Sequence, residues 1–510
     1  MSASVQSIIA SGTSGTIIDV ECSLSNNIPY IIIVGFANKA VGEAKERIRG
    51  AFVSSRIMLP RKRTTVNLAP ADLPKDESSF DLAIAVAILL ASQQIPPTLT
   101  AHQAFIGELG LEGDVRPVRG LIGKLVAGRG LGITTFFIPA SNLQQAQLVP
   151  GVELIPIRTL LELYSHLTGL TPQKTVATGA GQNVPLVNTG VTMSVQLSEV
   201  AGQDQAKRAL TIAAAGGHNL LFSGPPGTGK SMLAKALPSI LPPLDHEEVL
   251  EVTHLHSLAS HNYEHIFTAR PFRAPHHSAS PAAITGGGTS LRPGEISLAH
   301  RGILFFDELP EFGRATLEAL RQPLEDRVIT VARAKDSAEY PANFMLVATA
   351  NPCPCGYYGT SGTCRCQEYQ IMQYRQKLSG PIMDRIDLYA DVHEVQHGKL
   401  LGTRDNSAAD DDVREEVQRA RNMQKARFGN GTQLNAEMTN RDIKQLGRLA
   451  PTAKALLDRA ALNLHLSARA YMRTIKVART VADLAASPTI KDDHLSEALT
   501  YRSRSYQEQI

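Results

Sequence analysis

The segment 224–231 has the residue types and the spacing that bind a nucleotide phosphate. It reads Gly-Pro-Pro-Gly-Thr-Gly-Lys-Ser and so matches the pattern G-x-x-x-x-G-K-[ST] after an apolar run. The glycines let backbone N–H groups turn toward a phosphate, the lysine adds a positive charge, and the serine hydroxyl can bind Mg²⁺. We therefore expect ATP and Mg²⁺ at Gly224, Pro225, Pro226, Gly227, Thr228, Gly229, Lys230 and Ser231.

Two acids and one amide follow strand-like runs farther along the chain. Asp307 and Glu308 come directly after the apolar run 302–306, and Asn351 ends the run that starts at residue 344. Downstream of a phosphate-binding loop, we expect Asp307 to hold Mg²⁺, mostly through water, and Glu308 to polarise the attacking water. Asparagine is also a common turn former, but its position third in this order favours a role in orienting water near the γ-phosphate.

Four of the five cysteines lie in the short stretch 353–366 and form two C-x-C pairs. Structural zinc prefers four thiolates in a tetrahedron, usually from C-x₂₋₄-C turns, so the C-x-C spacing is tighter than usual. Free thiols and disulfides are the alternatives, and disulfides are rare in a reducing compartment. We favour Zn²⁺ bound by Cys353, Cys355, Cys364 and Cys366.

The pattern of apolar and polar residues divides the chain of 510 residues into pieces. Residues 1–168 alternate strand-like and helical runs, 169–192 are polar and read as a linker, and 193–395 have strand-like runs separated by helical ones, which favours a parallel sheet. The four-cysteine insert 353–366 falls in this middle piece. Residues 396–510 show helical periodicity with little strand signal, so a small helical domain is expected there.

Composition excludes several classes of protein. The net charge is only +3, from 51 basic and 48 acidic residues, so a nucleic-acid site must be local rather than spread over the chain. Five cysteines in so long a chain exclude a disulfide scaffold. The start of the chain has no clear signal peptide, and the most apolar runs are too short to cross a bilayer. We expect a soluble cytoplasmic protein with no membrane partner.

The order of phosphate-binding loop, acid pair and strand-end asparagine resembles that of the AAA+ ATPases. Residues 292–312 (RPGEISLAHRGILFFDELPEF) look like the magnesium-chelatase-like branch, and residues 34–36 and 44–49 resemble the N-terminal domain of the ComM/YifB family. The resemblance covers the whole chain. It implies the α/β fold class, with an AAA+ P-loop core built on a parallel sheet, an N-terminal Lon-protease-like α/β domain and a C-terminal helical lid.

The same resemblance implies a function. Family members are hexameric ring ATPases, and the family is implicated in natural transformation through a DNA branch-migration helicase. It thus implies a homo-hexamer that hydrolyses ATP, moves single-stranded or branched DNA, and works with recombination proteins to integrate transforming DNA. The alternative is a remodelling or chelatase-like ATPase that acts on a protein or a metal-insertion complex.

Two arginines are placed by the family pattern. Residues 380–388 (GPIMDRIDL) resemble the segment of the arginine finger, which would put Arg385 on a neighbouring subunit's nucleotide. A surface arginine paired with Asp384 or Asp387 is the alternative.

Residues 467–470 (SARA) resemble the sensor 2 motif of the family. This resemblance places Arg469 over the nucleotide from the helical lid. Arg473, one helical turn away, is the alternative for the same role.

The N-terminal piece resembles the proteolytic domain of Lon. Ser79 lies where that family has its nucleophile, but Ile122 occupies the position of the catalytic lysine. Lys124 is two residues farther on and is expected to face elsewhere. A serine without a base is a poor nucleophile, so we expect a module for interaction or DNA contact rather than a protease.

Histidines and basic residues gather between residues 254 and 340. A histidine metal site is conceivable, but insert loops with ordinary histidines are the simpler interpretation. In magnesium-chelatase-like ATPases such inserts can face the ring pore. The candidates for phosphate contacts are therefore Arg270, Arg273, His276, His277, Arg333 and Lys335.

Overall fold

The structure is a computed structural model of the chain, and it divides into two compact units. The first contains residues 1–189, 245–268 and 338–340, and the second contains residues 190–244, 269–337 and 341–510. The structure describes residues 2–11, 14–35, 39–71, 75, 78–97, 102–179, 195–259, 265–288, 292–332, 337–359, 362–377, 380–395, 407–429 and 431–502. Most of the predicted linker 169–192, from residue 180 onward, lies outside this description.

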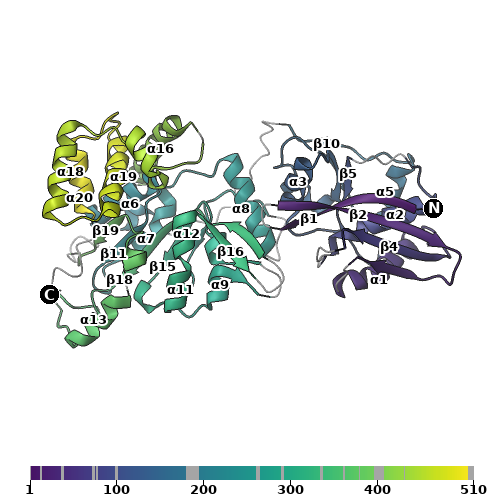
Figure 1. Cartoon of the computed structure of the whole chain (residues 1–510), viewed down its shortest axis with the longest axis horizontal. Helices are drawn as coiled ribbons and strands as arrows, with labels where there is room; N and C mark the ends of the chain where they lie inside the picture. The colour runs from purple at the N-terminus through teal and green to yellow at the C-terminus, as the bar shows by residue number, and fades with distance from the viewer. Residues whose placement is uncertain are drawn as a thin grey trace. The chain divides into compact units, whose positions relative to one another are not determined.

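The first unit is built on a mixed sheet of eight strands in the order β10-β9-β8-β5-β1-β2-β4-β3 (Figure 1). The long strands β1 and β2 form an antiparallel hairpin at its centre, whereas β5, β8 and β9 run parallel to one another. The strands are β1 (Ser2–Ser11), β2 (Ser14–Ser25), β3 (Ile31–Val34), β4 (Arg63–Ala69), β5 (Gln103–Phe105), β8 (Thr135–Pro139), β9 (Glu153–Ile157) and β10 (Val176–Ala177), with a small separate hairpin of β6 (Glu108–Leu109) and β7 (Val115–Arg116).

Helix α2 forms the core of this unit. Its sequence DLAIAVAILLA is apolar on every side, and ten of its eleven residues are buried as it packs on β1 and β2. A helix of this kind belongs inside a protein rather than on its surface. The other helices of the unit are α1 (Lys39–Ser54), α3 (Leu121–Gly130), α4 (Leu143–Ala146), α5 (Leu160–Leu167) and α8 (His246–Ala259), beside α2 (Asp81–Ala91). Across the described part of the chain, no helix combines the length and apolar character that a membrane crossing needs.

The expected orientation of Lys124 is wrong. Its Nζ lies 3.2 Å from Ser79 Oγ and 3.3 Å from the carbonyl oxygen of Ile8, inside the first unit. The first turn of α3 is buried on several sides, with Leu121, Ile122 and Lys124 all inaccessible. A spacing of two residues therefore does not turn Lys124 toward solvent, and Ser79 has an amine beside it after all. Both side chains are almost completely buried, at 3% and 1% exposure.

The second unit contains a five-stranded sheet in the order β12-β15-β18-β11-β19, in which every pairing is parallel. Its strands are β11 (Leu220–Ser223), β12 (Phe272–Arg273), β15 (Ile303–Phe306), β18 (Met345–Ala350) and β19 (Leu388–Asp391). Short buried runs such as LLFS and ILFF suit strands covered by helices on both faces. The predicted α/β fold class with a parallel-sheet core is confirmed.

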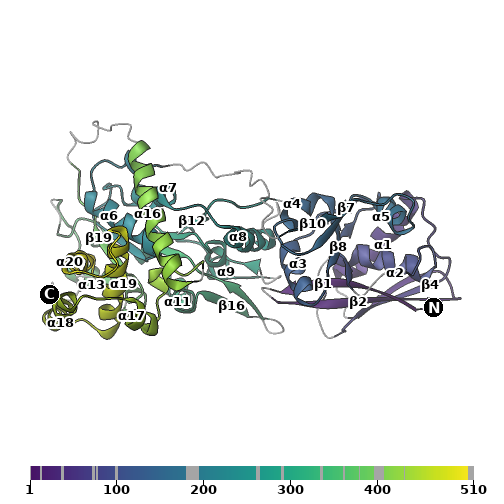
Figure 2. The same ribbon diagram turned by 90° about the horizontal axis from the view of Figure 1, so that it is seen from above.

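Helices and two short hairpins complete this core. The helices are α6 (Asp204–Gly216), α7 (Lys230–Ile240), α9 (Pro281–Thr285), α10 (Glu295–Leu298), α11 (Arg314–Ala319), α12 (Arg321–Asp326), α13 (Glu368–Lys377) and α14 (Gly380–Met383). One hairpin pairs β13 (Gly286–Gly287) with β14 (Arg292–Pro293), and the other pairs β16 (Val328–Ala332) with β17 (Ser337–Pro341), of which residues 338–340 are grouped with the first unit. The predicted helical C-terminal part is also present, as α16 (Ser407–Phe428), α17 (Asn440–Leu446), α18 (Pro451–Asn463), α19 (Ala468–Leu484) and α20 (Asp492–Thr500). Helix α16 packs on both α6 and α19 (Figure 2).

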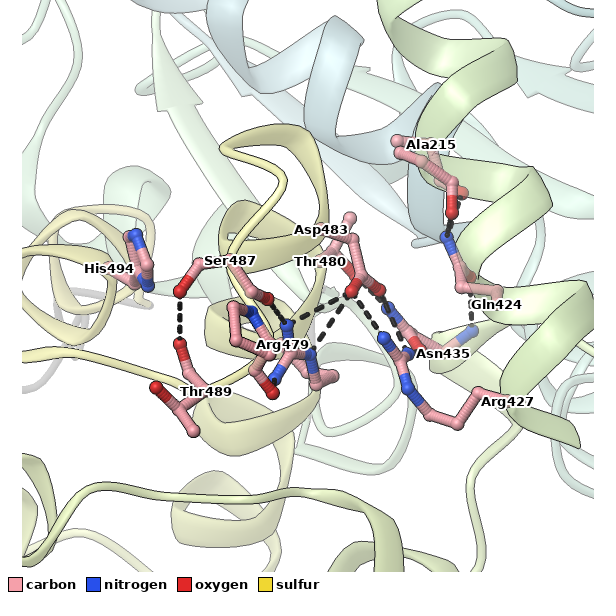
Figure 3. Close-up of polar contacts among 12 residues, drawn as sticks. Ala215, Gln424, Arg427, Asn435, Arg479, Thr480, Asp483, Ser487, Thr489 and His494 are labelled. Atoms are coloured by element: carbon pink, nitrogen blue, oxygen red, sulfur yellow. Dashed lines mark hydrogen bonds and ion pairs between the residues drawn. The ribbon is translucent and has the colours of Figure 1, made fainter.

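A buried polar cluster joins these C-terminal helices (Figure 3). Asp483 on α19 accepts from Arg479, one turn earlier, and from Arg427 at the end of α16. Asn435 adds a third donor, with its Nδ2 2.8 Å from the same carboxylate. Asp483 and Arg479 are fully buried, and a buried charge is tolerated when it is paired and hydrogen-bonded in this way.

The buried Ser79–Lys124 pair gives a first prediction. Because neither side chain is accessible to a peptide, we expect the purified protein to show no ATP-dependent cleavage of casein, and Ser79→Ala to behave as the wild type. Cleavage is measured by release of labelled fragments. Cleavage by the wild type that disappears in both Ser79→Ala and Lys124→Met would show instead that the pair is a working nucleophile and base.

Candidate active site

The ends of three neighbouring strands converge to form the candidate site. In the parallel register, Ser223 of β11 pairs with Ala350 of β18, and Phe306 of β15 pairs with Ala348 of the same strand. The residue that follows each strand therefore leaves the sheet at one edge. This edge brings together the phosphate-binding loop, the acid pair and Asn351, as the sequence order predicts.

The loop 224–231 has a backbone suited to an anion. Gly227 and Gly229 adopt left-handed conformations, with φ of 79° and 87°, that side-chain-bearing residues rarely take. Helix α7 begins directly after Gly229, so the positive end of its dipole and its free N–H groups face this loop. Inside the loop, the Thr228 hydroxyl donates to the carbonyl oxygen of Pro225 at 2.9 Å. These features fit the triphosphate of ATP.

Lys230 is held inside the loop that it terminates. Its Nζ donates to the carbonyl oxygens of Gly224 and Pro225 at 2.8 and 2.7 Å, and to Asn351 Oδ1 at 3.1 Å. Burial lowers the pKa of this lysine, while the charges of Asp307 and Glu308 act in the opposite direction. A positive charge so placed is ready to interact with phosphate oxygens.

A compact group of oxygen atoms lies beside Lys230 and fits Mg²⁺. Ser231 Oγ lies 2.9 and 3.0 Å from the two carboxylate oxygens of Asp307. Hydroxyl and carboxylate oxygens, completed by water and phosphate, are the ligands that Mg²⁺ uses in nucleotide sites. Thr349, which the sequence analysis missed, donates from Oγ1 to Asp307 at 2.7 Å and accepts from the backbone N–H of Glu308 at 2.8 Å. Its position in β18, two residues before Asn351, was the available signal.

Glu308 has an unusual backbone. Its φ of 55° places a residue with a long side chain in the left-handed region, which costs about 1–3 kcal/mol and occurs most often at functional sites. The bend turns the exposed carboxylate toward the strand-end amide, and Asn351 Nδ2 lies 3.4 Å from Glu308 Oε1. The two side chains that the sequence assigned to the attacking water are therefore neighbours.

The two predicted arginines form a second group. Arg385 and Arg469 both pair with Glu325 of α12, Arg469 at 3.3 Å. The hydrogen bond from Arg385 is the main cause that lowers the pKa of Glu325, with the charges of both arginines acting in the same direction. In this single subunit the two guanidinium groups are thus neighbours of each other, and the described contacts of Arg469 do not include the phosphate-binding loop.

The segment that carries Arg385 is fixed by contacts that the sequence did not reveal. Arg473 on α19 donates to the carbonyl oxygens of Met383, at 3.1 Å, and of Ile386. Asn219, at the start of β11, donates from Nδ2 to the carbonyl oxygen of Arg385 at 2.8 Å. Arg473 therefore holds the backbone on both sides of Arg385 by hydrogen bonds. Its described contacts are with this segment and not with the phosphate-binding loop.

Asp387 makes a further link from this segment to the lid. Its carboxylate lies 3.2 Å from His218 Nδ1, and the other ring nitrogen of His218 lies 2.8 Å from Thr480 Oγ1 on α19. Burial alone would raise the pKa of Asp387, but the hydrogen bond and charge of His218, together with the charges of Arg473 and Lys476, outweigh burial, and the pKa is lowered.

The four clustered cysteines come together. Their sulfur atoms all lie within 4.8 Å of one another, and the distances from Cys353 to Cys355 and Cys364 are 3.4 and 3.8 Å. Four sulfurs bound tetrahedrally at about 2.3 Å from one zinc ion lie roughly 3.8 Å apart, so the arrangement fits zinc. Hydrogen bonds from the backbone of Tyr357 and Arg365 lower the pKa of Cys355 to about 6, whereas burial raises the pKa of Cys366 to about 12. The four thiols thus differ in acidity, and the case for zinc rests on the distances between their sulfur atoms.

The residues predicted to contact DNA phosphates differ in their exposure and in their partners. Arg270 donates to the carbonyl oxygens of Pro242 and Arg301, and Arg273 pairs with Glu295 at 2.6 Å. Both guanidinium groups thus have internal partners. The exposed rings of His276 and His277 lie 4.1 Å apart, whereas Arg333 and Lys335 lie outside the described residues.

Comparison with known proteins agrees with this site. Three family models match: "Magnesium chelatase, subunit ChlI" over residues 196–400, "Subunit ChlI of Mg-chelatase" over 20–142, and "Magnesium chelatase, subunit ChlI C-terminal" over 407–502. Competence protein ComM of Haemophilus influenzae is 42% identical across 98% of this chain and 97% of its own length. The uncharacterized protein YifB of Escherichia coli is 39% identical, with 97% and 96% covered. The 67 kDa magnesium-chelatase subunit of Heliobacterium mobile is 26% identical over 39% of this chain and 36% of its own.

The chain belongs to the ComM/YifB family of magnesium-chelatase-like AAA+ ATPases. The site described above is accordingly an ATP- and Mg²⁺-dependent hydrolysis site. ATP supplies the phosphoryl group that water attacks. From this geometry we expect Lys230 and the loop to bind the phosphates. Asp307 and Ser231 would present oxygens to the metal, and Glu308 with Asn351 would orient water.

Two substitutions separate nucleotide binding from hydrolysis in this ComM/YifB ATPase. Lys230→Ala removes the main side-chain cation and should abolish binding of a fluorescent ATP analogue. Glu308→Gln keeps the size of the side chain but removes its charge, so ATP should bind normally while kcat falls roughly 10²–10⁴-fold. Phosphate release measures turnover. Near wild-type turnover of Glu308→Gln would disprove the assignment of Glu308.

Proposed function

We propose that this ATPase is a hexameric DNA motor, a branch-migration helicase that aids integration of transforming DNA by homologous recombination. The similarity to competence protein ComM, which extends over nearly the whole of both chains, supports this function most strongly. Under this proposal, the partners are single-stranded or branched DNA and recombination proteins, and ATP hydrolysis drives movement.

The placement of the arginines supports a ring. Arg385 and Arg469 bind a carboxylate of their own subunit, whereas the acid pair and Lys230 form a separate group. An arginine finger acts by offsetting the charge on the transferring phosphoryl group, and one supplied by another subunit contributes about 10³–10⁵-fold to turnover. We propose that Arg385 supplies this charge to the nucleotide of a neighbouring subunit, and that Arg469, which shares Glu325 with it, reaches a nucleotide from the lid.

DNA contacts are proposed to be made with the phosphate backbone. The exposed pair His276 and His277, together with the basic residues Arg333 and Lys335 that the sequence predicts as phosphate contacts, would bind the DNA backbone. Such contacts carry no base information, so binding depends on ionic strength rather than on sequence.

The remodelling alternative has one observation in its favour. Part of the chain, 39% of it, is also similar to a magnesium-chelatase subunit. Under this alternative, the same ATP site would drive rearrangement of a protein or of a metal-insertion complex, and DNA would have no effect on turnover.

We also propose that Cys353, Cys355, Cys364 and Cys366 bind one zinc ion as a structural site. The spacing of their sulfur atoms supports this proposal. Four thiolates leave no open coordination position, so the ion would stabilise the loop rather than take part in hydrolysis.

Mixed rings test the finger. Arg385→Ala should bind ATP but hydrolyse it poorly, and Lys230→Ala should not bind it. Mixing the two variants should restore part of the turnover, because some interfaces then pair an intact loop with an intact finger. Phosphate release across a titration of the two variants measures this restoration. No restoration, in a mixture shown by native mass spectrometry to contain both variants, would exclude action between subunits.

Migration of DNA branches tests the function itself. We expect the hexamer to resolve a synthetic four-way junction in an ATP-dependent manner, with Lys230→Ala as the inactive control. Binding to the junction should weaken steeply between 50 and 200 mM salt, by about 10³–10⁵-fold for 6–10 phosphate contacts. Failure of the assembled hexamer to bind DNA at low salt would favour the remodelling alternative.

A further inference from the structure

We propose that the four-cysteine loop is a support of the phosphate-binding loop, so that binding of zinc at the cysteines controls the affinity for ATP. This inference rests on the zinc site proposed above. It assigns to that site a regulatory role in nucleotide binding, through a contact between two loops that are more than a hundred residues apart in the sequence.

The two loops leave the sheet from adjacent strands. β18 ends at Ala350, Asn351 contacts Lys230, and Cys353 follows with a fully buried side chain. At the neighbouring strand end, the backbone N–H of Gly224 donates to the carbonyl oxygen of Ala350 at 3.3 Å. The first C-x-C pair is therefore tied by two residues of chain to the amide that Lys230 binds.

The first C-x-C pair then forms a tight turn. The backbone N–H of Gly356 donates to the carbonyl oxygen of Cys353 at 2.9 Å, and that of Tyr358 lies 3.3 Å from Cys353 Sγ. Hydrogen bonds from backbone N–H groups to the sulfur are typical of metal-binding turns, because they orient the ligand and stabilise its charge. The path of residues 353–358 is thus set by the cysteine cluster.

Gly356 makes the contact that joins the two loops. It has a φ of 85°, and a Cβ added to it would lie 2.5 Å from Cδ and 3.0 Å from Cγ of Pro226. Only a residue without a side chain allows this approach. The backbone at Gly356 thus packs directly on Pro226 in the middle of the phosphate-binding loop.

This packing explains how the metal can act on the nucleotide. The N–H groups of a phosphate-binding loop have to point at the phosphate together, and Pro226, an exposed residue of this loop, is the one that Gly356 contacts. A structural zinc site contributes much of the folding energy of a short loop. Without the ion, residues 353–366 lose that energy, Pro226 loses its support, and the loop samples conformations that bind phosphate less well.

A glycine pair in the same loop offers a matched test. Gly356→Ala should clash with Pro226, whereas Gly359, with a φ of 70°, has no described atom within 4 Å of an added Cβ. Both substitutions strain a left-handed backbone, so the difference between them reports the contact alone. We expect Gly356→Ala to keep about one zinc per chain and to bind a fluorescent ATP analogue at least tenfold more weakly than Gly359→Ala.

Removal of the metal completes the test. The full-length protein is treated with a chelator, and zinc release is followed by a metallochromic dye. ATP-analogue affinity should fall at least tenfold and return when zinc chloride is added. Purified reduced protein without zinc would disprove the metal site itself. The coupling would be disproved if the affinity for the ATP analogue stayed the same after the chelator had released the zinc. It would also be disproved if the two glycine variants bound the analogue equally well. Either result would leave the proposed DNA motor unaffected.

Discussion

The parallel register of three strands is the constraint on which the active site depends. β11, β15 and β18 all run in one direction, and their pairing aligns the residues at which they end. Each of these strands is followed directly by a site residue, namely Gly224, Asp307 or Asn351. These three residues are more than forty positions apart in the sequence. A ladder shifted by two residues would carry the acid pair about 7 Å away from Ser231.

Helix α19 unites functions that are separate in the sequence. At the start of α19, Arg469 pairs with Glu325 and Arg473 donates to the backbone of the segment that contains Arg385. In the middle of the helix, Thr480 contacts His218. Its last turn contributes Asp483 to the buried cluster in Figure 3. Because these contacts lie on one helix, α19 connects Glu325, the segment around Arg385 and His218 within the second unit.

Sites formed by short stretches of sequence could be predicted, whereas contacts between residues far apart in the sequence could not. The phosphate-binding loop, the acid pair and the cysteine cluster each lie in a short stretch with a defined spacing. Thr349 and Arg473 act through partners more than forty residues away, so their contacts could not be predicted, although Thr349 lies two residues before Asn351 and Arg473 was the alternative to Arg469. The prediction for Lys124 was wrong because Leu121, Ile122 and Lys124 are all buried in the first turn of α3, so a step of two residues does not lead to solvent.

The position of β11 between β18 and β19 has a consequence for folding during synthesis. This strand carries Leu220, Leu221 and Phe222, and its two neighbours in the sheet, β18 and β19, are made much later in synthesis. A ribosome has to deliver the chain as far as Asp391 before those apolar residues are covered on both sides. Until then the nascent chain presents an unpaired hydrophobic strand, the kind of surface that aggregates and that chaperones bind.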